Sequence, residues 1–188
     1  MAVRHGVRAI YHATFADDEA LDMLTAARGR VFVAPTPGII YAHLDEAAGV
    51  PPADVPEMRQ TEASIKRVAP ELKARGVRLV PGGDYGFAFN PIGKNARDLR
   101  LFVEWFGFSP AEALRSATQY GGQLMNMGDE LGLIKEGYLA DLLLVEGDPL
   151  ADITLLEDQA NLSVIIKDGR FHKLAEGRRS KAAAVLTR

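Results

Sequence analysis

The chain has no cysteine, and its 188 residues have a formal net charge of only −3. Without cysteine there can be no disulfide, no thiolate metal ligand and no cysteine nucleophile, and we expect a cytoplasmic protein. The acidic pI, near 5.8, disfavours nucleic acid and anionic membranes as partners, because proteins approach both with a basic surface. The expected partner is therefore a small molecule or another protein chain.

Long hydrophobic runs are also missing. No stretch approaches 18 consecutive apolar residues, and the first residues lack the basic flank and apolar centre of a signal peptide. We therefore expect neither a membrane span nor a secretory leader. The remaining composition, 47% hydrophobic and 25% charged, is ordinary for a globular protein and is sufficient for a sizeable core.

Short apolar runs alternate with helical patterns over the first 80 residues. The pattern predicts strands at residues 6–12, 31–36 and 77–80, with helices at 17–28 and 61–75. Strands that alternate with helices form parallel sheets through right-handed crossovers. The sequence therefore predicts an α/β fold.

Residues 37–56 interrupt this alternation with four prolines. We interpret them as an insertion that shapes a pocket or forms a lid, with a short helix at 41–48. Two further helices are predicted at 96–106 and 109–125. The second begins with Ser-Pro-Ala-Glu, which has the spacing of a capping box.

From about residue 128 the apolar pattern changes to the period of two that is typical of strands. Strands are predicted at 140–145 and 162–167, and an Asp-Gly pair at 168–169 indicates a hairpin turn. The predicted organisation is therefore an α/β unit over residues 1–127, a small β portion over 128–175 and a basic tail over 176–188.

The stretch V-R-L-V-P-G-G-D-Y-G, at residues 77–86, is the centre of the functional interpretation. A buried strand ends at Pro81, and the two glycines place Asp84 just past that end. His12 ends the first predicted strand in the same way. Ligands and catalytic residues of α/β proteins lie at the carboxyl ends of strands. The alternative is that the glycines only form a turn and Asp84 caps the next helix.

Several ordered motifs carry a resemblance to a known family. They are G-V-R-A-I-Y-H (6–12), D-D-E-A-L (17–21), G-D (83–84), N-A-R-D-L (95–99), S-P-A-E-A-L-R-S-A-T (109–118), G-L-I-K-E-G-Y-L-A-D-L (132–142) and G-D-P-L (147–150). In this order and spacing they resemble the C-terminal half of the amidohydrolase superfamily, in its imidazolonepropionase-like and Xaa-Pro dipeptidase-like branch. The resemblance covers roughly residues 3 to 175.

The resemblance implies a metal-dependent hydrolase of amide-like or cyclic C–N bonds, with a TIM-type (β/α)8 barrel and a small β-sandwich. The three predicted strands would be the sixth to eighth strands of that barrel. By the same resemblance, His12 binds metal or substrate, and Asp84 binds metal and acts as general acid/base. The implied cofactor is a divalent metal, with zinc expected.

The chain departs from the family in one important respect. A complete barrel needs roughly 250 residues, whereas this chain provides three barrel strands. The family's His-x-His pair, its lysine and its fifth-strand histidine have no counterpart, and a catalytic zinc usually has about three protein ligands. We therefore expect activity only with a missing N-terminal half. The alternatives are an incomplete fragment that folds by homo-oligomerisation and a non-hydrolytic binding protein on the same scaffold.

Two further residues are candidate substrate contacts, and two other histidines are not. His43, in the proline-rich segment, and Tyr85, next to Asp84, are predicted to contact a small-molecule substrate. His5 is predicted to lie at the surface, and His172 in the β portion is predicted to be structural.

Overall fold

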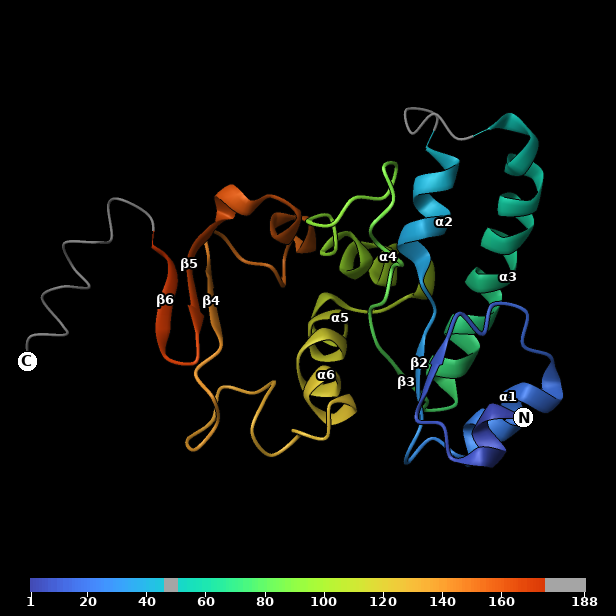
Figure 1. Cartoon of the computed structure of the whole chain (residues 1–188), viewed down its shortest axis with the longest axis horizontal. Helices are drawn as coiled ribbons and strands as arrows, with labels where there is room; N and C mark the ends of the chain where they lie inside the picture. The colour runs from blue at the N-terminus through green and yellow to red at the C-terminus, as the bar shows by residue number, and fades with distance from the viewer. Residues whose placement is uncertain (46–50, 175–188) are drawn as a thin grey trace, which may run out of the picture.

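The computed structural model describes residues 1–45 and 51–174, which contain two separate three-stranded sheets. Figure 1 shows the two sheets on either side of a group of helices. The first sheet is parallel and has the order β1 (Ala9–Tyr11), β2 (Phe32–Ala34), β3 (Arg78–Leu79). The second is antiparallel and has the order β4 (Leu142–Val145), β5 (Leu162–Lys167), β6 (Arg170–Leu174).

The parallel sheet confirms the predicted alternation of strands and helices. Val33, in the central strand, lies opposite Ile10 on one side and Leu79 on the other. The paired strands lie inside the predicted apolar runs and are shorter than them at both ends. Among the described strands, β1 and β3 each pair only with β2, so both edges of this sheet are free.

The described helices lie on both faces of the parallel sheet. Their bounds are α1 (Asp18–Ala26), α2 (Pro37–Leu44), α3 (Val55–Ala74), α4 (Arg97–Phe106), α5 (Pro110–Ala117) and α6 (Gln119–Leu124). Helices α1 to α5 contribute to the core on one face of the sheet, and α6 packs on the other face. Short 3-10 turns lie at Ala2–His5, Pro52–Asp54, Ile153–Glu157 and Gln159–Asn161. None of the described helices is long and apolar enough to cross a membrane.

Two helix predictions need correction. The segment 37–56 was predicted as an insertion with a helix at 41–48, but α2 begins at Pro37, whose fixed φ favours a helix start. Residues 46–48 of the predicted helix lie outside the described residues. The predicted helix 109–125 is divided at Thr118, whose ψ is −78°. Thr118 is β-branched, and Gly121 and Gly122 follow it inside α6, so this stretch is weakly helix-forming.

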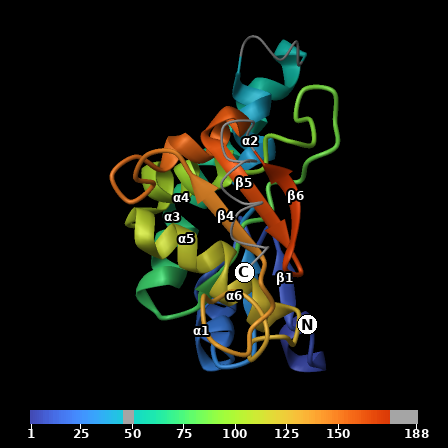
Figure 2. The same ribbon diagram turned by 90° about the vertical axis from the view of Figure 1, so that its left-hand side faces the viewer.

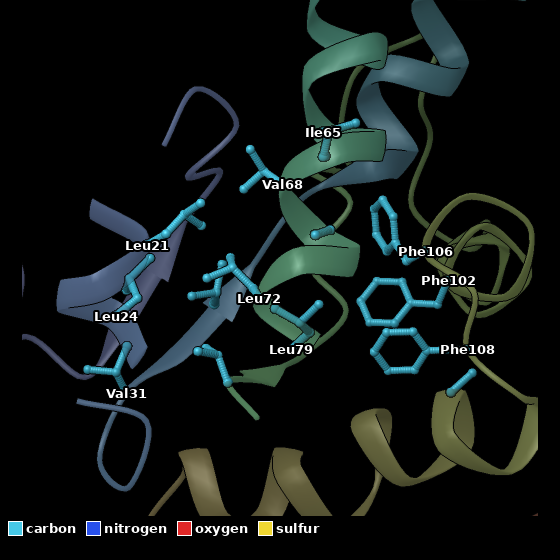
Figure 3. Close-up of a cluster of buried hydrophobic side chains, with 14 of the residues drawn as sticks. Leu21, Leu24, Val31, Ile65, Val68, Leu72, Leu79, Phe102, Phe106 and Phe108 are labelled. Atoms are coloured by element: carbon cyan, nitrogen blue, oxygen red, sulfur yellow. The ribbon is translucent and has the colours of Figure 1, made fainter. Parts of the chain in front are cut away.

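The main core lies between the parallel sheet and the helices (Figure 3). Leu21 and Leu24 from α1 pack on one side of α3, and the rings of Phe102, Phe106 and Phe108 pack on the other. The ring centroids of Phe102 and Phe106 are 5.2 Å apart, in a tilted arrangement that aromatic pairs favour. This packing holds the strands rigidly, and with them the residues at their carboxyl ends.

The opposite face of the parallel sheet has a smaller cluster. Phe32, Ala34 and Val80 pack against Tyr120 and Leu124 of α6. This cluster holds α6 against the second face of the sheet. The carboxyl ends of the strands are not covered by it, and residues there line the pocket described below.

The antiparallel sheet has strands at the positions predicted within residues 140–167, and it confirms the hairpin. Asp168 and Gly169 both have positive φ, 51° and 72°, as the predicted Asp-Gly turn requires. Figure 2 shows β4, β5 and β6 side by side, turned toward the viewer. An ion pair between Arg100 of α4 and Glu157, at 2.7 Å, connects this portion to the first. The predicted basic tail, residues 176–188, lies outside the described residues.

Candidate functional site

A pocket of about 590 Å³ lies at the carboxyl ends of the three parallel strands. It is lined by Tyr11, His12, Thr36, Gly82, Gly83, Asp84, Tyr85, Ile92 and Asn95. Parallel strands all end at the same edge of a sheet, so residues that are far apart in sequence meet there. The structure thus brings His12, Asp84 and Tyr85 to a single pocket.

The backbone has an uncommon conformation where each of these strands ends. His12, Thr36 and Asp84 have φ values of 65°, 53° and 57°, in the left-handed region that favours glycine. A non-glycine residue in this region costs roughly 1–2 kcal/mol. Strain of this kind, repeated at three neighbouring strand ends, is typical of a functional site.

His12 is held by two contacts to the neighbouring strand and the residues that follow it. Its backbone N–H donates to the carbonyl oxygen of Ala34, at 2.8 Å. Its ring atom Nδ1 lies 2.8 Å from Thr36 Oγ1. His12 is exposed, so the rest of the ring is accessible from the pocket.

The loop that carries Asp84 is held by two buried polar side chains. The Asn90 side-chain amide donates to the carbonyl oxygens of Gly83, at 3.0 Å, and Asp84, at 2.9 Å. The Asp98 carboxylate accepts the backbone N–H of Gly82 and the hydroxyl of Tyr85, both at 3.0 Å. The loop backbone is thus fixed, while the Asp84 residue itself is exposed.

The Asp98 carboxyl is only 1% exposed, and its environment changes its acidity. Burial raises the pKa of Asp98 to about 6, although hydrogen bonds from Tyr85 and the Gly82 amide oppose that change. Burial and the Asp98 charge also raise the pKa of the Tyr85 hydroxyl above its usual value. A Cβ on Gly83 would lie 2.4 Å from Asp98 Oδ1, so this close approach requires glycine.

Asp98 and Asn90 were not identified as site residues from the sequence. Asp98 is in the first turn of α4, where an acidic residue is usual because it interacts with the helix dipole. Asn90 lies in a turn-rich segment where asparagine is common. Asp98 belongs to the N-A-R-D-L motif that carries the family resemblance, and this motif was the signal that could have identified it.

The other predicted site residues are placed differently. Tyr85 lines the pocket, but its hydroxyl is engaged by Asp98. His43 is not among the residues that line it: Nδ1 donates to the carbonyl oxygen of Ile39, at 3.0 Å, and the ring contacts the edge of Phe89. Substrate contact by Tyr85 and His43 stays a prediction.

The described residues do not form a complete metal site. Within residues 1–45 and 51–174, no group of three or more His, Cys, Asp or Glu side chains could hold a metal ion. His12 and Asp84 are two candidate donors, one fewer than a catalytic zinc usually has. The part of the chain that the structure describes therefore does not account for metal binding alone.

The fold and the pocket define an α/β protein whose candidate acid–base residues lie at the ends of parallel strands. Residues 2–171 match the Amidohydrolase family. The chain belongs to this family, which confirms the resemblance found in its motifs.

Among curated proteins, the chain is 26% identical over 176 residues to ochratoxinase from Aspergillus niger, covering 92% of the chain and 35% of the relative. It is 27% identical over 171 residues to imidazolonepropionase from Cereibacter sphaeroides, covering 91% of the chain and 38% of that enzyme.

Solved structures give a similar result. A Xaa-Pro dipeptidase with bound methionine in the active site matches with 31% identity and a TM-score of 0.75, covering 92% of this chain and 41% of that one. A putative prolidase from Bifidobacterium longum matches with 27% identity and a TM-score of 0.80, covering 99% and 47%. The chain thus spans less than half the length of the relatives named here.

Proposed function

We propose that this chain forms the C-terminal part of a metal-dependent amidohydrolase that hydrolyses an amide-like or cyclic C–N bond in a small-molecule substrate. The observation that carries the proposal is that His12 and Asp84, from the ends of β1 and β3, line one pocket. Membership of the Amidohydrolase family supports a hydrolase, and the names of the relatives point to ochratoxin, imidazolone and Xaa-Pro substrates.

We assign β1, β2 and β3 to the sixth, seventh and eighth strands of a (β/α)8 barrel. Residues 1–127 would then be the barrel portion and 128–175 the β portion. The two free edges of the parallel sheet support this assignment, because a barrel continues through both edges. The short coverage of the relatives is consistent with missing strands.

In this proposal Asp84 is the general acid/base. Its carboxylate is exposed in the pocket and is able to accept a proton from an attacking water and return it to the leaving nitrogen. His12 contacts the divalent metal, expected to be zinc, or the substrate. Further metal donors would have to come from the missing N-terminal half, because the described residues provide too few.

The test combines metal analysis with activity assays. The purified chain would be assayed on a Xaa-Pro dipeptide, an N-acyl amino acid and an imidazolone, alone and after co-production with the part of the Xaa-Pro dipeptidase that this chain does not cover. We expect turnover and bound zinc only in the second case. Turnover and stoichiometric zinc in the chain alone would show that the count of essential ligands is wrong.

Variants separate the two proposed roles from general damage. Asp84→Asn should lower the turnover of the complemented enzyme by about 100-fold or more, which is the usual contribution of acid–base catalysis. His12→Ala should lower turnover together with the zinc content or the affinity for substrate. Asp129→Asn, at an exposed position away from the pocket, is the matched control and should keep its turnover. Unchanged turnover in Asp84→Asn would contradict the proposal.

A second candidate is a catalytically incomplete chain that folds by association with a second copy. The free sheet edges favour it, and so do the exposed Tyr11 and Phe15, which are 62% and 65% exposed. Light scattering on the purified chain distinguishes the cases. A dimer or larger assembly supports this candidate, and a uniform monomer with cooperative unfolding contradicts it.

A further inference from the structure

Thr36 has an unusual backbone conformation for its residue type. It follows β2, lies between Pro35 and Pro37, and has φ 53° and ψ 52°. A β-branched residue is a genuine outlier in this left-handed region, and the following proline restricts the backbone conformations of Thr36 further. Glycine would adopt this conformation with less strain. The chain nevertheless has threonine here, so the side chain requires an explanation.

The Thr36 side chain is directed to the candidate site. Thr36 is only 2% exposed, and its hydroxyl oxygen lies 2.8 Å from Nδ1 of His12. The backbones of the two residues are also connected, because the His12 N–H donates to Ala34, two residues before Thr36. The hydroxyl and the imidazole therefore have a fixed relative position that does not depend on a mobile loop.

A contact at Nδ1 has a chemical consequence for the other ring nitrogen. In a neutral imidazole one nitrogen carries the proton and the other has a free lone pair, and the hydrogen bond of one nitrogen decides which. Histidines that bind metals usually donate their second N–H to a neighbouring oxygen, which fixes the orientation of the ring. A hydroxyl oxygen is able to accept such a hydrogen bond.

We propose that Thr36 is a positioning residue for His12. The hydroxyl oxygen of Thr36 accepts the Nδ1–H of His12, which selects this tautomer and leaves the Nε2 lone pair available to the pocket. The strain at Thr36 is retained because glycine, the residue that suits the backbone, has no hydroxyl. This inference rests on the site role proposed for His12, but it concerns the protonation of the ring and can be tested without turnover.

The test reads the tautomer of His12 by long-range ¹H–¹⁵N NMR at about pH 8, where an ordinary histidine is neutral. The His12→Gln variant identifies the signals of His12 among the four histidines of the chain. We expect the wild-type protein and Thr36→Ser to show Nδ1–H and an unprotonated Nε2. In Thr36→Val, which keeps the branched shape without the hydroxyl, both nitrogens should move to the averaged shifts of a tautomer mixture.

Thr36→Gly distinguishes positioning from a purely structural role. This variant removes both the backbone strain and the hydroxyl. Its urea midpoint should therefore equal or exceed that of Thr36→Val, while His12 should lose the Nδ1–H tautomer as it does in Thr36→Val. Urea unfolding of every variant shows whether it is folded. Wild-type protein with the proton on Nε2, or a folded Thr36→Val with the wild-type spectrum, would overturn the inference.

Addition of excess Zn²⁺ to the chain co-produced with the complementary part of the Xaa-Pro dipeptidase tests the proposed function separately, because the described residues alone provide too few metal donors. A shift of the Nε2 signal supports His12 as a metal donor. If the Nδ1–H tautomer depends on Thr36 but Zn²⁺ leaves Nε2 unchanged, the positioning role is upheld and the metal role of His12 fails.

Discussion

The buried Asp98 carboxyl should make the stability of the chain depend on pH, and Asp98→Asn should remove that dependence. The pKa of Asp98 is raised from 3.8 to about 6, mainly by burial. One pKa unit corresponds to about 1.4 kcal/mol, so the difference of about two units corresponds to about 3 kcal/mol of unfolding free energy.

The sign follows from proton binding. Between about pH 4 and pH 6 the folded state holds the Asp98 proton while the unfolded state has lost it. The stabilisation that this proton gives is fully present below pH 4 and is lost as the pH rises through 6. Several carboxylates with lowered pKa values, such as Glu62 and Glu112, act in the opposite direction. The difference in unfolding free energy between wild type and Asp98→Asn isolates the contribution of Asp98.

Urea unfolding followed by the fluorescence of Trp105, the single tryptophan, provides the measurement. Asparagine keeps an oxygen for the Gly82 N–H and an amide that can donate to the Tyr85 hydroxyl oxygen, so the variant should fold. The stability of wild type relative to Asp98→Asn should fall by about 3 kcal/mol between pH 4 and pH 7. Equal pH profiles in the two proteins would refute the argument that the buried carboxyl is protonated below pH 6.

Two further predictions concern local packing. Gly83→Ala should destabilise the chain by about 1–3 kcal/mol in urea unfolding, because its Cβ would meet Asp98 at 2.4 Å. Gly29→Ala, where no atom lies within 4 Å of the added Cβ, is the control, and an equal loss in both would contradict the steric explanation. Ser109→Ala should cost about 1 kcal/mol, because the Ser109 side chain caps α5 together with Glu112. A thermal midpoint that does not change would show that this cap is redundant.

Local rules were sufficient for most of the elements. Alternating apolar runs predicted the parallel strands, the Ser-Pro-Ala-Glu motif predicted the start of α5, and the Asp-Gly pair predicted the hairpin between β5 and β6. Each of these depends on residues within a few positions of one another. The start of α2 was missed because Pro37 was interpreted as part of an insertion, although proline is equally suited to the first turn of a helix.

The sequence by itself determined the α/β pattern, the family, and the placement of His12 and Asp84 at strand ends, because apolar periodicity and ordered motifs are local properties. Only the tertiary structure decided what surrounds them. Asp98 is 16 and 13 positions from Gly82 and Tyr85, whose groups it binds, and Thr36 is 24 positions from His12. Their burial and hydrogen bonds depend on how strands and helices pack, which no local pattern records.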